Sequence, residues 1–163
     1  TLKNMKVVVN ASPVIFLAKI ELMDKLPGLY DEVIIPAGVI NEIQKYHDKA
    51  SRWLHHNHTG YEVATVDVPA HIHAWDIGKG EAEVIAAAQM TKDSIAALDD
   101  KAARNCAAAL NLNVIGTIGL ILRMQKEKLI HDASTYLDSL RGQGYRINNT
   151  LYQHALKIAS TKD

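Results

Sequence analysis

The sequence predicts an α/β fold that is built around a mostly parallel sheet. Short runs of β-branched and other apolar residues alternate along the chain with segments that have helical spacing or a high alanine content. This alternation is typical of parallel strands that are joined by helices. Several apolar runs also end on polar or acidic residues, as residues 7–9 end at Asn10 and residues 95–98 end at Asp99. Open parallel sheets bind their ligands at such strand ends.

The first half of the chain contains three expected strands. Residues 5–9 are a β-branched run that is typical of a buried strand. Ser12 can cap the helix that follows, and Pro13 suits its first turn. The predicted elements are, in order, a strand over 5–9, a helix over 12–26 that Pro27 and Gly28 end, a strand over 33–35, a helix over 39–46, a polar segment over 47–61 and a strand over 61–68.

The second half repeats the alternation and then becomes helical. The predicted elements are, in order, a helix over 80–92, a strand over 95–98, a helix over 100–110, a strand over 113–115 and helices over 118–128, 134–140 and 149–159. No repeat, low-complexity tract or linker divides the sequence. We therefore expect a single domain over residues 1–163.

The composition limits the classes of function. Lys and Arg together number 18, and so do Asp and Glu, which gives a net charge of zero. Global basicity therefore gives no argument for nucleic-acid binding, although a local basic groove beside an acidic centre remains open. One cysteine, Cys106, excludes an internal disulfide and fits a reducing compartment. No apolar stretch has the length of a membrane span and no signal peptide is visible, so we expect a cytoplasmic protein.

The histidines in the middle of the chain lack the spacing of a zinc site. None of the close pairs has the i, i+4 spacing of helical ligands, and no cysteine lies nearby. We therefore predict that residues 47–61 form a solvated loop or the end of a helix. The histidines concerned are His55, His56, His58, His71 and His73.

Side chains with oxygen ligands stand at the expected strand ends and helix starts. Asn10 follows the first strand, and Asp99 and Asp100 follow a later one. Glu81 opens a helix, and Glu42 lies on another. Oxygen ligands without cysteine favour Mg²⁺ or Mn²⁺ over zinc. Each residue also has a structural explanation, because Asp is a common N-cap and Glu is favoured in the first turn of a helix.

Six segments, in this order, carry a resemblance to a known family: residues 7–20, residues 33–36 followed by Glu42, residues 80–86, residues 98–104, residues 114–120 and residues 144–147. Together they resemble the PIN-domain family and, within it, the compact, prokaryotic VapC-like branch. The resemblance covers about residues 5–158. It implies a three-layer α/β/α sandwich with a central, mostly parallel sheet of four to five short strands. It also implies a core over residues 5–130 and a C-terminal helical extension over residues 131–160.

PIN domains are typically metal-dependent ribonucleases, and many are toxins that are paired with a small antitoxin protein. The resemblance therefore implies an endoribonuclease of toxin type that hydrolyses RNA phosphodiester bonds. It further implies Mg²⁺ or Mn²⁺ as cofactor and an antitoxin as partner. Apolar helix faces that the core does not cover would support a homodimer, and the lack of a long apolar stretch predicts no membrane association.

The family's functional residues can be carried over position by position. The implied metal ligands are Asn10, Glu42, Glu81 and Asp100, with Glu83 as an alternative to Glu81. Asp99 lies beside Asp100 and assists, and Ser12 matches the hydroxyl residue that orients the first ligand. These residues, without Glu83, are the candidate catalytic set. Lys101 and Arg104 follow Asp100 closely and are candidates for binding the substrate.

Asn10 departs from the family, because most members have Asp at this position. Asn offers one carbonyl oxygen and no charge, and fewer ligand charges weaken metal binding. Two hypotheses therefore follow. The first is a metal-dependent endoribonuclease in which Asn10 is a neutral ligand. The second is a catalytically weakened PIN fold that acts as an RNA- or antitoxin-binding regulatory module. A flap-type DNA nuclease is a third alternative, which the short chain disfavours.

Overall fold

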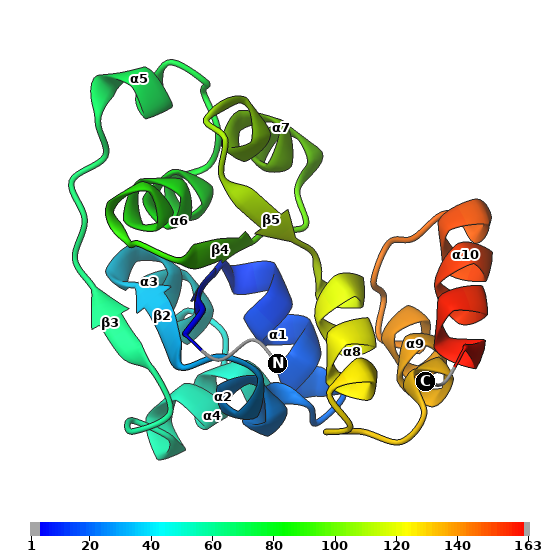
Figure 1. The fold of residues 1–163 in the computed structure, drawn as a ribbon. Coiled ribbons are helices and arrows are strands. Elements are labelled where there is room, and N and C mark those ends of the chain that lie inside the picture. Colours follow the sequence, from blue (N-terminus) through cyan, green and yellow to red (C-terminus); the bar gives the residue numbers. More distant parts are fainter. Residues whose placement is uncertain (1–3, 162–163) are drawn as a thin grey trace.

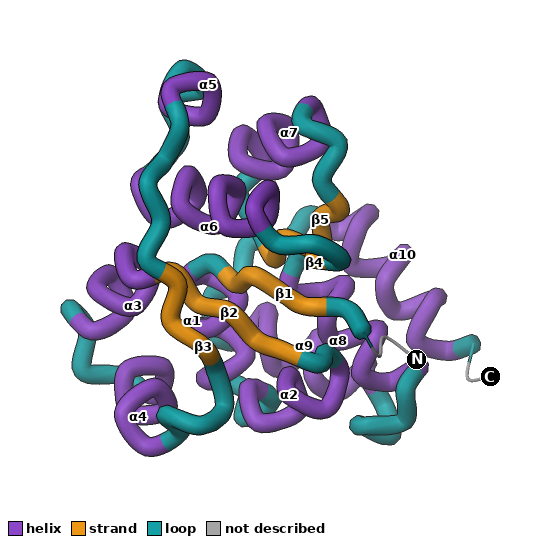
Figure 2. The backbone as a smooth tube through the Cα atoms, turned by 60° about the vertical axis from the view of Figure 1, so that its left-hand side comes forward, coloured by secondary structure: helices purple, strands orange, loops and turns teal. Residues whose placement is uncertain are grey.

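The computed structural model describes residues 4–161. Within these residues the strands form one five-stranded sheet in the order β3-β2-β1-β4-β5, and every neighbouring pair is parallel (Figure 2). The strands are β1 (Lys6–Val9), β2 (Glu32–Pro36), β3 (Glu62–Ala64), β4 (Ser94–Ala97) and β5 (Asn113–Ile115). The predicted parallel sheet is thus confirmed, with β1 at its centre.

Helices cover both faces of this sheet. The helices α6 and α7 lie on one face, and α1, α2 and α8 lie on the other (Figure 1 and Figure 2). The predicted layered α/β fold is therefore confirmed. The helical elements are α1 (Ala11–Lys19), the 3₁₀ helix η1 (Met23–Lys25), α2 (Leu26–Leu29), α3 (Ala37–Gln44), α4 (Lys49–His56), α5 (Ala70–His73), α6 (Lys79–Met90), α7 (Lys101–Ala109), α8 (Thr117–Lys126), α9 (Ala133–Gly142) and α10 (Asn149–Ser160).

The centre of the core is β1, in which Val7, Val8 and Val9 are fully buried. A strand that is covered on both faces must be apolar at every position, which explains this continuous valine run. Val9 pairs with Ala97 of β4. The two strands therefore end side by side, and the residues that follow them, Asn10 and Leu98 to Asp100, are delivered to the same edge of the sheet.

The predicted helix over residues 12–26 is wrong in its length and in its cap. The helix α1 begins after Asn10 and ends at Lys19. Glu21 has a left-handed φ of 62°, and the Leu22 N–H donates to the Leu17 carbonyl, which closes the helix end. The helical spacing of apolar residues continues beyond this point because η1 and α2 bury Met23 and Leu26 in the same core.

The predicted solvated segment is also wrong over residues 49–56, which form α4. Asp48 and Ser51 make a capping box at its start: each side chain accepts from the other residue's backbone N–H. Ala50 and Leu54 are buried, while His55 and His56 are exposed on the outer side. The spacing of Asp48 and Ser51 was the available signal for this helix.

The C-terminal helices pack together beside α8 (Figure 1). Gln125 of α8 joins them, because its Nε2 donates to the Ala159 carbonyl at 2.9 Å and its Oε1 accepts from the Ala133 N–H at 2.6 Å. The two predicted helices at this end are confirmed as α9 and α10. No helix in the described part of the chain combines the length and hydropathy that a bilayer span requires.

Candidate active site

A pocket of about 400 Å³ lies at the carboxyl ends of β1 and β4. It gathers residues from both halves of the chain, including most of the predicted acidic set. Its lining residues are Asn10, Ser12, Phe16, Glu81, Asp99, Asp100, Gly144, Tyr145 and Arg146. The edge of the sheet that the sequence pattern indicated is therefore where these side chains meet.

Asn10 contributes a buried oxygen without a partner. Its backbone N–H continues the sheet by donating to the Ala97 carbonyl at 3.1 Å. It is the N-cap residue of α1, yet its side chain makes no capping bond. One reason is Pro13 at the third helical position, where no N–H is available to donate. The Oδ1 atom of Asn10 is buried and accepts no hydrogen bond from any described residue.

Glu42 approaches Asn10 over the backbone of Gly80. A Cβ atom at position 80 would lie 3.1 Å from Glu42 Oε2 and 3.2 Å from Asn10 Oδ1. The two oxygens, one from α3 and one from the start of α1, therefore converge on the first turn of α6. Glycine at position 80 is what leaves them this space, because any side chain would displace one of the two oxygens.

Asp99 is the hydrogen-bond hub of the site. Its Oδ2 accepts from Ser12 Oγ and from Thr117 Oγ1, both at 2.7 Å. Its Oδ1 accepts from the Thr117 N–H at 2.8 Å and from the Tyr145 hydroxyl at 2.7 Å. Within residues 4–161 each oxygen thus accepts two hydrogen bonds, so the carboxylate joins β4 to α1, to the start of α8 and to the segment before α10.

Asp100 and Glu81 keep carboxylate oxygens available. Asp100 is the N-cap of α7, and only its Oδ2 is engaged, accepting from the Ala103 N–H at 3.0 Å. Glu81 lies in the first turn of α6 with its carboxylate folded back over Gly78. None of the ion pairs formed among the described residues involves Glu42, Glu81 or Asp100.

Glu83 lies apart from the pocket. It is 6% exposed, and its Oε1 accepts from the Gly38 N–H at 3.0 Å, where its carboxylate fills the space beside that glycine. It therefore stabilises the start of α3, the helix that carries Glu42. Of the two glutamates between which the sequence left the choice open, Glu81 is the one that lines the pocket.

Two residues have surroundings that the resemblance did not indicate. The Ser12 hydroxyl donates to Asp99 rather than to Asn10, the ligand it was expected to orient. Arg104 of α7 turns back toward the end of β4, where its Nη1 donates to the Leu98 carbonyl at 3.0 Å and lies beside Gly116. Lys101 is exposed in the first turn of α7.

Tyr145 and Arg146, which are not among the predicted site residues, also line the pocket. Burial, followed by the charge of Asp99 and the hydrogen bond to it, raises the pKa of Tyr145 above its usual value, while Arg104 acts in the opposite direction. Tyr145 is therefore protonated at neutral pH and donates to Asp99. The only available signal was the resemblance of residues 144–147 to one branch of a family, which named no function for them.

The donor set suits a hard divalent cation. The oxygens of Glu42, Glu81 and Asp100 carry negative charge, and the buried Asn10 Oδ1 lacks any donor. Among the described residues no three His, Cys, Asp or Glu side chains form a closed metal-binding group. Asp99 is engaged in four hydrogen bonds, and the Glu81 carboxylate lies over Gly78.

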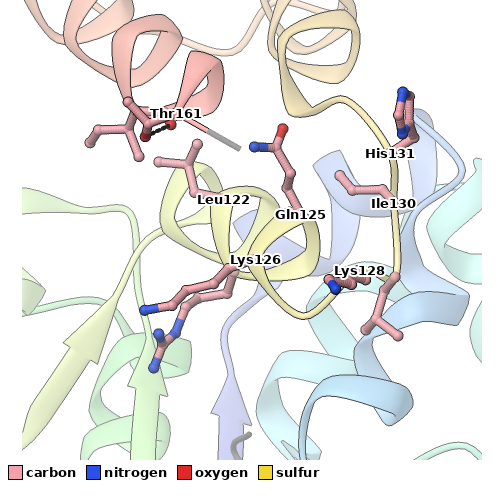
Figure 3. A pocket seen from close by; sticks show the side chains of 10 residues that line it. Leu122, Gln125, Lys126, Lys128, Ile130, His131 and Thr161 are labelled. Carbon is pink, nitrogen blue, oxygen red and sulfur yellow. Dashed lines mark hydrogen bonds between the residues drawn. The ribbon is translucent and has the colours of Figure 1, made fainter. Parts of the chain in front are cut away.

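A larger pocket, of about 720 Å³, lies elsewhere, between the end of α8, the segment that follows it and the end of α10 (Figure 3). Leu122 and Ile130 line it, together with the basic side chains of Lys126, Lys128 and His131. None of the acidic residues described above lines it. Glu81, Asp99 and Asp100 line the smaller pocket instead, whereas Glu42 lines neither of the two.

The sequence matches a family profile over most of its length. A profile of the family DUF3368, described as a PIN domain, matches residues 6–161. No curated protein matches the sequence. PIN domains are commonly nucleases and generally use divalent metal ions. The profile spans the parallel sheet, the acidic pocket and the C-terminal helices alike, and the chain therefore belongs to the PIN-domain family.

Proposed function

We propose that this protein is a metal-dependent endoribonuclease of toxin type. The observation that carries the proposal is the buried, unpartnered Oδ1 of Asn10, which faces Glu42 across Gly80 in a site that Glu81 and Asp100 complete. A buried polar atom without a partner costs about 1–3 kcal/mol, so it is retained where a ligand satisfies it. Membership of the PIN-domain family supports nuclease chemistry at this site.

Asn10, Glu42, Glu81 and Asp100 would hold Mg²⁺ or Mn²⁺. When bound, such an ion lowers the pKa of a water molecule and stabilises the charge of a phosphate under attack. The chain itself orients these groups. Asp100 lines the pocket and is held at the start of α7 by the capping bond to its Oδ2, which leaves Oδ1 available. Glu81, without an ion-pair partner among the described residues, can accept a proton from the attacking water.

The toxin class rests on the resemblance to the VapC-like branch, with a small antitoxin protein as the proposed partner and a homodimer as the proposed assembly.

The nuclease chemistry can be tested without the antitoxin and without knowledge of the assembly. We expect wild-type protein to cleave a fluorogenic single-stranded RNA in Mn²⁺ or Mg²⁺, to lose this activity in EDTA, and to regain it when Mn²⁺ is restored. Equal cleavage in EDTA and Mn²⁺, in protein free of contaminating nuclease, contradicts the proposal.

The second candidate function is a catalytically weakened PIN domain that binds RNA or an antitoxin. The neutral side chain of Asn10 favours it, because it lowers the charge of the ligand set. Asn10→Asp adds a charge to the ligand set, so we expect Mn²⁺ to bind about tenfold more tightly and RNA cleavage to rise. In EDTA the same variant buries an unpaired carboxylate beside Glu42, so we expect its melting temperature to fall and Mn²⁺ to restore it.

Asn148→Asp is the matched control for this prediction. Asn148 is the exposed N-cap of α10 and accepts from the Leu151 N–H at 2.8 Å, a role that Asp fills equally well. Its melting temperature should respond to Mn²⁺ as the wild type does. Cleavage that appears only in Asn10→Asp supports the binding module, whereas strong cleavage by the wild type supports the nuclease. A metal response that is the same in both variants contradicts the placement of Asn10 in the site.

A further inference from the structure

The segment between α9 and α10 forms one wall of the acidic pocket. Gly144, Tyr145 and Arg146 line it, although they follow Asp99 and Asp100 by more than forty residues. Two backbone bonds fold the segment onto the end of α9, from the Gly144 N–H to the Arg141 carbonyl and from the Tyr145 N–H to the Leu140 carbonyl. Gly144 has a φ of 90°, which glycine adopts without strain, so the turn has a defined course.

Tyr145 fixes this segment to the catalytic edge of the sheet by two contacts. Its hydroxyl donates to Asp99 Oδ1 at 2.7 Å. Its ring packs edge-on against Phe16 of α1, with 5.1 Å between ring centroids and an interplanar angle of 89°. These contacts of Tyr145 hold the backbone of the exposed Arg146, the next residue, beside the pocket that Asp99 and Asp100 line.

Arg146 is the cation that this arrangement leaves without a partner. It lines the same pocket as Glu81 and Asp100, yet across residues 4–161 it forms no ion pair or hydrogen bond. Arg104, the arginine closer in sequence to the acidic residues, is bound to the Leu98 carbonyl. A guanidinium in a pocket that carboxylates also line matches the needs of a phosphodiester, because it binds phosphate oxygens in a bidentate manner.

We propose that Arg146 is a substrate-binding residue that contacts a phosphate of single-stranded RNA in this pocket, and that Tyr145 is the positioning residue that holds it there. This inference rests on the proposed function and deepens it, since it names the residue that places the RNA backbone. It also gives Asp99 a second role: the carboxylate at the end of β4 sets the position of the RNA-binding segment through the Tyr145 hydroxyl.

The test measures RNA binding separately from cleavage. All variants are made in an Asp100→Asn background and assayed in Mn²⁺ with a fluorescein-labelled, single-stranded RNA of mixed sequence, over a series of salt concentrations. We expect Arg146→Gln to weaken binding about tenfold and to lower the slope of log K against log salt by about 0.7, the value for one phosphate contact on a single strand. Arg146→Lys should retain the salt slope and part of the affinity.

Two further variants separate contact from positioning. Tyr145→Phe keeps the packing on Phe16 and the charge of Arg146, so we expect affinity to fall about threefold with the salt slope unchanged. Arg141→Gln is the matched control, because Arg141 lies over the Tyr152 ring, 4.1 Å from its centroid, and outside the pocket. Its RNA affinity and salt slope should equal those of the Asp100→Asn parent.

The outcomes distinguish this inference from the proposed function. If the parent binds RNA and Arg146→Gln binds it with the same affinity and slope as Arg141→Gln, the role of Arg146 is overturned while the nuclease proposal stands. If wild-type protein neither binds nor cleaves RNA in Mn²⁺, the proposed function fails and the inference fails with it. A slope that falls in Arg146→Gln but not in Arg141→Gln supports the assignment.

Discussion

We expect Asp100→Asn to lower the rate of RNA cleavage in Mn²⁺ by about a thousandfold, which corresponds to about 4 kcal/mol of transition-state stabilisation. The physical reason is the loss of one negative charge at the free oxygen of Asp100, which lines the pocket. The fold is retained, because the other oxygen caps α7 by accepting from the Ala103 N–H, and Asn caps a helix as well as Asp does. The measurement is the initial rate on a fluorogenic RNA, with the melting temperature recorded for the same samples.

Asp48→Asn is the matched control for this substitution. Asp48 is also an N-cap carboxylate, at the start of α4, and it accepts from the Ser51 N–H at 3.1 Å. It lies outside the acidic pocket, so its replacement should leave the cleavage rate unchanged. Cleavage by Asp100→Asn at the wild-type rate would show that the carboxylate is only a cap and would remove it from the site.

Asp99→Ala lowers the free energy of unfolding by about 3 kcal/mol or more, which makes it the largest single destabilisation expected in this part of the fold. Its carboxylate accepts hydrogen bonds from Ser12, Tyr145 and both the backbone and side chain of Thr117. Thr117 is completely buried, so its donors cannot turn to water instead. Removal of the acceptor leaves these groups unsatisfied at the junction of β4, α1 and α8.

Urea denaturation of wild type, Asp99→Ala and Asp138→Ala measures this effect. Asp138 is exposed on α9 and makes no hydrogen bond or ion pair with other described residues, so its replacement should change stability by less than about 0.5 kcal/mol. A decrease in the free energy of unfolding for Asp99→Ala as small as that for Asp138→Ala would mean that the hydrogen bonds of Asp99 do not stabilise the contact between β4, α1 and α8. The hydrogen bond from Tyr145 to Asp99 would then be too weak to position Tyr145.

The sheet and the position of the site could be predicted because both depend on local patterns. Valine runs mark buried parallel strands, and a strand that ends on Asn10 or Asp99 places that residue at the binding edge. The convergence of Glu42 on Asn10 depends on the space over Gly80. No pattern in the sequence encodes that space, so the sequence could name Asn10 and Glu42 as candidate ligands but could not show that they converge.

The roles of Asp99 and Tyr145 could not be predicted, because they arise from contacts between residues that are distant in sequence. The hydroxyl of Tyr145 donates to Asp99 because α9 and α10 pack beside α8, which brings the segment between them to the pocket. The end of α1 was predicted wrongly for a related reason. The apolar residues beyond Glu21 keep helical spacing, but they belong to η1 and α2, which bury them in the core. Both the contact between Asp99 and Tyr145 and the end of α1 are determined by tertiary packing rather than by local sequence pattern.

The most direct test of the metal site is a calorimetric titration of Mn²⁺ into metal-free wild-type protein and into Glu42→Gln. Glu42 is exposed on α3, so the variant removes a charge at the site without disturbing the core. The account predicts saturable binding by the wild type and binding about tenfold weaker in the variant. Absence of saturable binding by the wild type, or the same affinity in both proteins, would contradict a metal site formed by Asn10, Glu42, Glu81 and Asp100.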